Sequence, residues 1–90
     1  MFYYTYVLYC KNSDDKGEFY IGSCEDLTAR YKRHKTKEVK TTSKFKSVTL
    51  VYYEASLSKT DARKRELQLK TGFGRGYIKR RLENYFDMRR

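Results

Sequence analysis

The sequence predicts an α/β fold, namely a compact α/β sandwich in which helices pack on a small, mixed, three-stranded sheet. Three segments rich in β-branched and aromatic residues are separated by segments with helical spacing. The chain has 90 residues, which leaves little material for two separate cores, so we expect a single domain spanning residues 1–90. A content of 39% apolar and 17% aromatic residues is high enough to argue against disorder.

Three segments are predicted to be strands. Residues 3–10 are almost continuously apolar or aromatic, which is typical of a central strand covered on both faces. Turn-forming residues fill positions 11–17, and residues 18–23 return to an extended pattern, so the first two strands should form an antiparallel hairpin. Residues 48–53 form the third strand. Because it is reached through a helix, we expect it to pair parallel to a neighbour.

The first helix is predicted to begin after Asp26, whose side-chain oxygen can cap it, and to run to about residue 34. Leu27, Arg30 and His34 share one of its faces because they are three and four residues apart. The lysine- and threonine-rich stretch 35–46 has no apolar periodicity and is predicted to be an exposed connection.

A second helix should start at Ser58, where a serine followed three residues later by Asp61 resembles a capping box, and should reach about residue 70. Its inner face would carry Ala62, Glu66 and Leu69. The glycine-rich stretch 71–76 is predicted to break this second helix. A last helix, with apolar residues at helical spacing, should follow to about residue 88.

The chain is strongly basic. A net charge of +10 and a pI near 9.7 favour a polyanionic partner, with DNA first and RNA still open, although a merely solvated surface would have the same composition. No secretory signal or membrane-length apolar run is visible, so we expect a cytoplasmic protein with no membrane partner. Cys10 and Cys24 lack the spacing of a zinc site and are predicted to be reduced and structural.

Several motifs occur in a characteristic order. Residues 4–8 read Tyr-Thr-Tyr-Val-Leu on the first strand, and residues 20–22 read Tyr-Ile-Gly on the second. Together with later polar residues, they resemble the GIY-YIG nuclease superfamily, in particular small stand-alone members similar to the N-terminal nuclease domain of the bacterial excision-repair endonuclease. The resemblance covers roughly residues 3–80. The positions that match the family's site are Tyr6, Tyr20, Arg30, His34 and Glu66.

The resemblance implies a metal-dependent endonuclease. Glu66 looks like the carboxylate that holds Mg²⁺ or Mn²⁺, and a single carboxylate can hold such an ion when water and phosphate complete its shell. Arg30 would bind the phosphate in the transition state. One of the two motif tyrosines would order or deprotonate the attacking water; the resemblance favours Tyr6 over Tyr20 as the base, with His34 as a donor or proton relay.

Other residues surround this predicted site. Gly22 should permit a close approach of the backbone. Ser23 stands where many relatives have lysine, so Lys32, Lys35 or metal-bound water could activate the base. Asn84 is the only late candidate for the family's final asparagine. The side chains expected to contact nucleic acid are Arg30, Lys32, Arg33, Lys35 and Arg75.

Three functions remain open on the sequence. The first is a DNA endonuclease acting in repair, recombination or the processing of mobile elements. The second is a non-catalytic nucleic-acid-binding module that keeps the fold; an RNA-binding or protein-interaction domain is a third reading. The resemblance implies that extra domains normally supply the specificity of such nucleases. We therefore expect weak sequence preference, or a partner protein or homodimer that supplies specificity.

Overall fold

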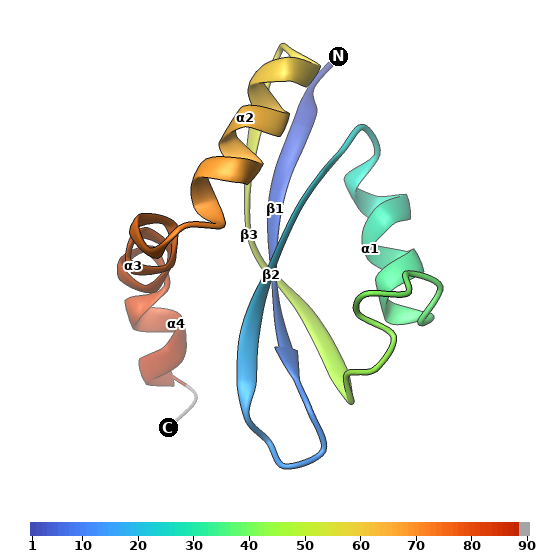
Figure 1. Cartoon of the computed structure of the whole chain (residues 1–90), viewed down its shortest axis with the longest axis vertical. Helices are drawn as coiled ribbons and strands as arrows, with labels where there is room; N and C mark the ends of the chain where they lie inside the picture. The colour runs from blue at the N-terminus through green and yellow to red at the C-terminus, as the bar shows by residue number, and fades with distance from the viewer. Residues whose placement is uncertain (89–90) are drawn as a thin grey trace.

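The computed structural model describes residues 1–88 and shows a sheet between two layers of helices (Figure 1). Helix α1 covers one face, and α2, α3 and α4 cover the other, which confirms the predicted α/β sandwich. The elements in chain order are β1 (Tyr3–Lys11), β2 (Gly17–Cys24), α1 (Leu27–Lys35), β3 (Ser47–Ser56), α2 (Lys59–Leu69), α3 (Gly72–Arg81) and α4 (Glu83–Met88).

The three strands lie in the order β2-β1-β3. Strand β1 is central, as predicted, and its residues 5–8 are all buried because both faces of the sheet are covered. Strands β1 and β2 form the expected antiparallel hairpin.

The expectation that the third strand pairs parallel to a neighbour is wrong. Strand β3 pairs antiparallel with β1, so the sheet is antiparallel throughout and not mixed. Because both outer strands run opposite to β1, β3 does have the direction of β2, as a strand–helix–strand crossover requires. The position between them is already occupied by β1, so the two parallel strands never become neighbours.

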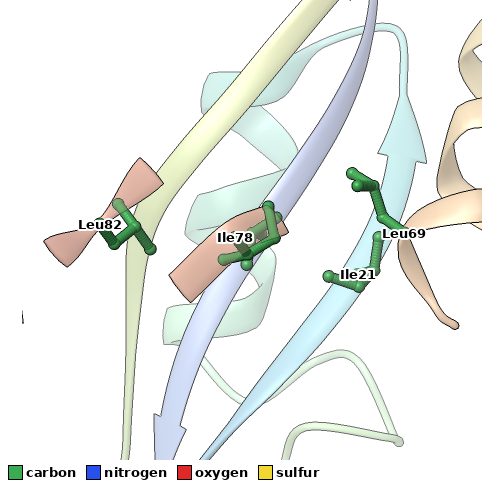
Figure 2. Packing of buried hydrophobic residues seen from close by; sticks show 5 residues of the cluster. Ile21, Leu69, Ile78 and Leu82 are labelled. Carbon is green, nitrogen blue, oxygen red and sulfur yellow. The ribbon is translucent and has the colours of Figure 1, made fainter. Parts of the chain in front are cut away.

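Each face of the sheet has its own hydrophobic core. On the α2–α4 face, Val7 and four other buried residues pack together, and Figure 2 shows Ile78 and Leu82 lying over the sheet with α1 behind it. On the α1 face, the buried residues are Tyr6, Leu8, Cys10 and Phe45. Cys10 is therefore a core side chain, and both it and Cys24 are free thiols, in agreement with the prediction.

The predicted helix starts are confirmed at both capping residues. The side chain of Asp26 accepts a hydrogen bond from the Ala29 amide at 3.0 Å, and that of Ser58 accepts one from the Asp61 amide at 3.2 Å. These caps satisfy amides that have no partner within their helices. They fix where α1 and α2 begin and therefore which side chains face the sheet.

The segment between α1 and β3 was expected to be an exposed connection, and this is wrong. Val39, Thr42 and Phe45 are all buried, with Thr42 only 1% exposed. They are three residues apart, so the successive turns of the segment direct them toward the sheet while the lysines between them stay in water.

The glycine-rich stretch does break the second helix as predicted, because α2 ends at Leu69. Residues 72–76 also form the first turns of α3, which Thr71 caps by accepting a hydrogen bond from the Gly74 amide. Gly74 is needed because a Cβ there would collide with the Leu69 carbonyl group. The single last helix that the spacing predicted is instead two helices, since α3 ends at Arg81 and α4 begins at Glu83.

Candidate active site

Three polar side chains meet on the face of the sheet covered by α1. Tyr6 projects from central strand β1, while Arg30 and His34 lie one turn apart on α1 and both face the sheet. Arg30 Nε donates to Tyr6 Oη at 3.1 Å, and Tyr6 Oη lies 2.8 Å from His34 Nε2. The structure therefore brings three of the predicted site residues into direct contact.

The neighbours of this cluster determine where its protons lie. Because Tyr6 Oη accepts from Arg30, its own hydrogen is directed to His34 Nε2. His34 Nδ1 then carries the ring proton and donates it to Thr42 Oγ1 at 2.7 Å, and the Thr42 hydroxyl points to the Val39 carbonyl at 3.4 Å. In this arrangement every buried hydrogen has an acceptor.

Burial controls the protonation of both central groups. It raises the pKa of the Tyr6 phenol to about 12, outweighing the opposite effect of the Arg30 guanidinium. It lowers the pKa of His34 to about 4, and the positive charges of Arg30 and Arg33 lower it further. At neutral pH Tyr6 is protonated and His34 is neutral, so Tyr6 can act as a base only if its proton passes to Nε2 at the same time.

Thr42 belongs to this cluster, although the sequence around it predicted an exposed connection. Its hydroxyl is the partner that fixes the His34 tautomer. The available signal was the three-residue spacing from Val39 to Thr42 to Phe45, which marks the buried side of the connection.

Gly22 makes room for Tyr6. A Cβ at this position would lie 2.5 Å from Tyr6 Oη and 2.6 Å from its Cζ, so the tyrosine ring occupies the space that a side chain on β2 would fill. The predicted close approach at Gly22 is therefore confirmed. Tyr6 is on the central strand and its ring lies over Gly22 of the edge strand β2. Its hydroxyl group is therefore close to the edge of the sheet.

Tyr20 completes the aromatic surroundings of the imidazole. Its ring centroid lies 5.1 Å from that of His34 and 6.4 Å from that of Tyr6. It is half-buried, and it also lines a groove on the free edge of β2. Tyr20 also interacts with Arg30, where the hydrogen bond to Tyr6 first, and Tyr20 to a smaller extent, raise the pKa of the guanidinium. It therefore lies beside both the cation and the imidazole of the proton chain.

Glu66 lies across the sheet, on the α2 face, and is 5% exposed. Ser23 Oγ donates to its Oε1 at 2.6 Å, while Arg63 Nη1 and Lys70 Nζ lie 2.7 and 2.8 Å from its Oε2. Burial acts to raise the pKa of Glu66, but the hydrogen bonds from Lys70, Ser23 and Arg63 outweigh it, and the net pKa is lowered. The carboxylate is therefore ionised at neutral pH.

The two groups of site residues are connected through consecutive positions of β2. Gly22 lies under the Tyr6 ring, and Ser23, the next residue, bonds Glu66 on the opposite face. Within residues 1–88 no hydrogen bond joins Glu66 directly to Tyr6, Arg30 or His34. The candidate site therefore extends over both sides of the β2 edge.

Comparison with known proteins identifies the family of this chain. Residues 2–81 match the GIY-YIG catalytic domain family. The chain belongs to the GIY-YIG family. It is also 34% identical over 70 residues to a UPF0213 protein found in two strains of Staphylococcus epidermidis, and the match covers 77% of this chain and 80% of that protein. No solved structure matches the chain significantly.

GIY-YIG domains form a nuclease-type family, which implies a nucleic-acid substrate for this chain. The name UPF0213 states no activity. Among residues 1–88, no helix is long and apolar enough to cross a membrane.

Metal binding, which is typical of GIY-YIG nucleases, can be compared with the groups around Glu66. The described residues contain no group of three or more histidine, cysteine or acidic side chains that could enclose an ion. A single ionised carboxylate fits a hard cation that keeps most of its water and gains phosphate oxygens from a substrate. Arg63 and Lys70 are 59% and 47% exposed, so both can turn away and leave Oε2 to an ion.

The basic residues predicted to contact nucleic acid fall into two places. Lys32, Arg33 and Lys35 are exposed on α1 beside Arg30, and Lys35 lies 5.1 Å from the Tyr31 ring centroid. Arg75 is on α3, on the other side of the sheet.

Two predictions about neighbouring residues can also be compared with the structure. Among the described residues, the cation that hydrogen-bonds Tyr6 is Arg30 and not Lys32 or Lys35, and Ser23 bonds Glu66. Asn84 is exposed on α4.

Proposed function

We propose that this GIY-YIG domain is an endonuclease that hydrolyses phosphodiester bonds of DNA with the aid of Mg²⁺ or Mn²⁺. The observation that carries the proposal is the hydrogen-bonded chain from Arg30 through Tyr6 to His34 and Thr42. A buried, neutral imidazole next to a phenol is an acceptor for a proton, and such an acceptor serves general base catalysis. Any buried tyrosine hydroxyl needs a hydrogen-bond partner, but here the two partners are a cation and a neutral proton acceptor, which suits proton transfer as well as packing.

In this proposal Tyr6 removes a proton from the attacking water while it passes its own proton to His34 Nε2. The imidazolium formed is stabilised because Nδ1 still donates to Thr42. Arg30 uses Nε for Tyr6, so its terminal nitrogens can bind two phosphate oxygens as negative charge develops there. Bound at Glu66, the metal ion would supply Lewis-acid stabilisation of the phosphate and of the leaving oxygen.

A second candidate function is supported by a specific contact. Both oxygens of Glu66 already have partners, with Ser23 on one and Arg63 and Lys70 on the other. A carboxylate neutralised in this way favours a non-catalytic nucleic-acid-binding module that keeps the fold. The two functions differ in whether an ion can displace the two cationic side chains.

The test is cleavage of plasmid and branched DNA by the purified protein with Mg²⁺ or Mn²⁺ and with a chelator. Tyr6→Phe keeps the ring and removes the proton-transfer group, and we expect it to lower the rate roughly 10²- to 10⁴-fold. Glu66→Gln should abolish cleavage, whereas Glu83→Gln on the exposed surface of α4 should not change it. Circular dichroism should show that all variants fold.

Metal-dependent cleavage that is lost in Glu66→Gln and kept in Glu83→Gln would support the endonuclease. A folded parent protein that binds DNA at low salt and cuts none of the substrates would instead support the binding module. The biological setting that we propose is DNA repair, recombination or mobile-element processing in the cytoplasm, with a partner protein or a homodimer supplying specificity.

A further inference from the structure

A groove of about 830 Å³ lies along the free edge of β2, on the face covered by α2, α3 and α4. It is separate from the chain of hydrogen bonds around Tyr6, which is on the α1 face. Its size falls within the range of roughly 300–1,000 Å³ typical of pockets for small ligands. A single nucleotide fits such a space, whereas a double helix does not enter it.

Aromatic rings from three elements line part of the groove. Tyr9 of β1, Phe19 of β2 and Phe86 of α4 are half-buried, with ring centroids 5.0–6.1 Å apart. Tyr9 lies across Gly17, where a Cβ would collide with its hydroxyl group. The missing side chain at Gly17 lets this ring reach the edge of the sheet, in the same way that Gly22 does for Tyr6 on the other face.

Basic side chains line the rest of the groove. Lys70, Arg75 and Lys79 are exposed there, and among the described residues that line the groove Glu18 is the only acidic one. Basic groups beside aromatic rings are the combination by which proteins hold single-stranded nucleic acid, because the cations follow the phosphates and the bases stack on the rings.

The groove is next to the predicted metal ligand. Lys70 lines it and at the same time lies 2.8 Å from Glu66 Oε2, and Tyr20 lines it on the β2 side. A strand held in the groove would therefore have a phosphate near the carboxylate.

We propose that this groove binds unpaired nucleotides of DNA, with at least one base against the Tyr9, Phe19 and Phe86 rings and the phosphates on Lys70, Arg75 and Lys79. The proposal rests on the endonuclease function and specifies its substrate as DNA with a single-stranded segment at the point of cutting. Double-stranded DNA would have to open before it could occupy the groove.

The test is equilibrium binding by fluorescence anisotropy in the presence of a chelator, so that no cleavage is needed. The probes are a labelled thymidine oligonucleotide, an abasic oligonucleotide of equal length and charge, and a duplex. We expect the thymidine oligonucleotide to bind roughly 5- to 150-fold more tightly than the abasic one, because the abasic probe has no base to stack on the rings. The duplex should bind more weakly than the thymidine oligonucleotide.

Matched variants separate the groove from general charge and from folding. The double variant Arg75→Ala and Lys79→Ala should weaken binding. It should also make the slope of log affinity against log salt concentration shallower by about 0.7 for each phosphate that is no longer neutralised. Lys59→Ala with Lys64→Ala removes the same charge from α2, outside the groove, and should have a smaller effect.

The rings are tested by variants that keep apolar volume. Phe86→Leu and Phe19→Leu should reduce the preference for thymidine over abasic probes, whereas Phe73→Leu, which changes an exposed ring outside the groove, should not. Thermal unfolding checks that each variant folds.

Equal affinity for thymidine and abasic probes, or equal losses of affinity in the two double variants, would overturn the groove proposal. Neither of these two results depends on cleavage. If the protein cleaves DNA but gives either result, the endonuclease function stands and the proposed role of the groove is rejected. A protein that shows the base preference but never cleaves would keep the groove as a binding site and lose its role in cutting.

Discussion

Replacing Thr42 by valine tests the proton chain behind Tyr6. Valine has nearly the same shape as threonine, and position 42 is 1% exposed, so the substitution removes a hydroxyl without leaving a large cavity. His34 Nδ1 then loses its partner at 2.7 Å in a place that water does not reach. A buried donor left without a partner costs about 1–3 kcal/mol.

We therefore expect the free energy of unfolding of Thr42→Val to fall by about 1–3 kcal/mol. In a domain of this size each kcal/mol lowers the melting temperature by about 4–8 °C. Urea unfolding followed by circular dichroism measures the first quantity, and a thermal scan measures the second. Cleavage should also slow. Without Thr42 Oγ1, the His34 proton is no longer held on Nδ1, so Nε2 is not always free to accept the proton of Tyr6.

Two further variants make this result interpretable. Thr41→Val changes the preceding, exposed threonine and should alter stability by less than about 0.5 kcal/mol. Thr42→Ser keeps the hydroxyl and should restore much of the cleavage rate. If Thr42→Val were no less stable than Thr41→Val, the hydrogen bond to His34 would contribute nothing, and the assigned tautomer would be wrong.

Two other predictions follow from the same cluster. The pKa of His34 is about 4 in the folded chain and about 6.5 in an unfolded one, so its contribution to stability is complete above pH 6.5 and is lost as the pH falls toward 4. Urea titrations should show about 1.6 kcal/mol of this loss between pH 6.5 and 5, and a profile for His34→Gln with the same slope would refute it. Gly22→Ala should destabilise the fold by about 1–3 kcal/mol and abolish cleavage, because the new methyl group displaces the Tyr6 hydroxyl. Gly72→Ala meets no atom within 4 Å and should be neutral in the same unfolding assay.

Local signals in the sequence predicted much of the fold. The capping residues Asp26 and Ser58 mark the starts of α1 and α2 because a cap depends only on a few neighbouring residues. The partner of β3 could not be predicted in this way. It depends on which position in the sheet is free after the hairpin has formed, and this is a property of the whole chain.

The same distinction applies to the candidate site. The spacing from Arg30 to His34 is local, and it correctly placed both side chains on one face of α1. The structure adds that this face is toward the sheet. Arg63 and Lys70 are likewise three and four residues from Glu66, in α2 and at its end, so their contacts are local. Ser23 contacts Glu66 from 43 residues away, and the geometry of this contact appears only when the chain is folded. The sequence therefore indicated which residues carry chemistry more readily than it indicated which residues hold them in place.

The alternation of Gly22 and Ser23 on β2 has a consequence for changes in chain length. Shifting the pairing of β2 with β1 by one residue would turn every β2 side chain to the opposite face. The space under Tyr6 would then be filled by a side chain, and the serine would point away from Glu66. The hairpin loop between β1 and β2 can therefore be lengthened by natural insertion or by design, provided that the added residues bulge outward and leave the strand register as it is.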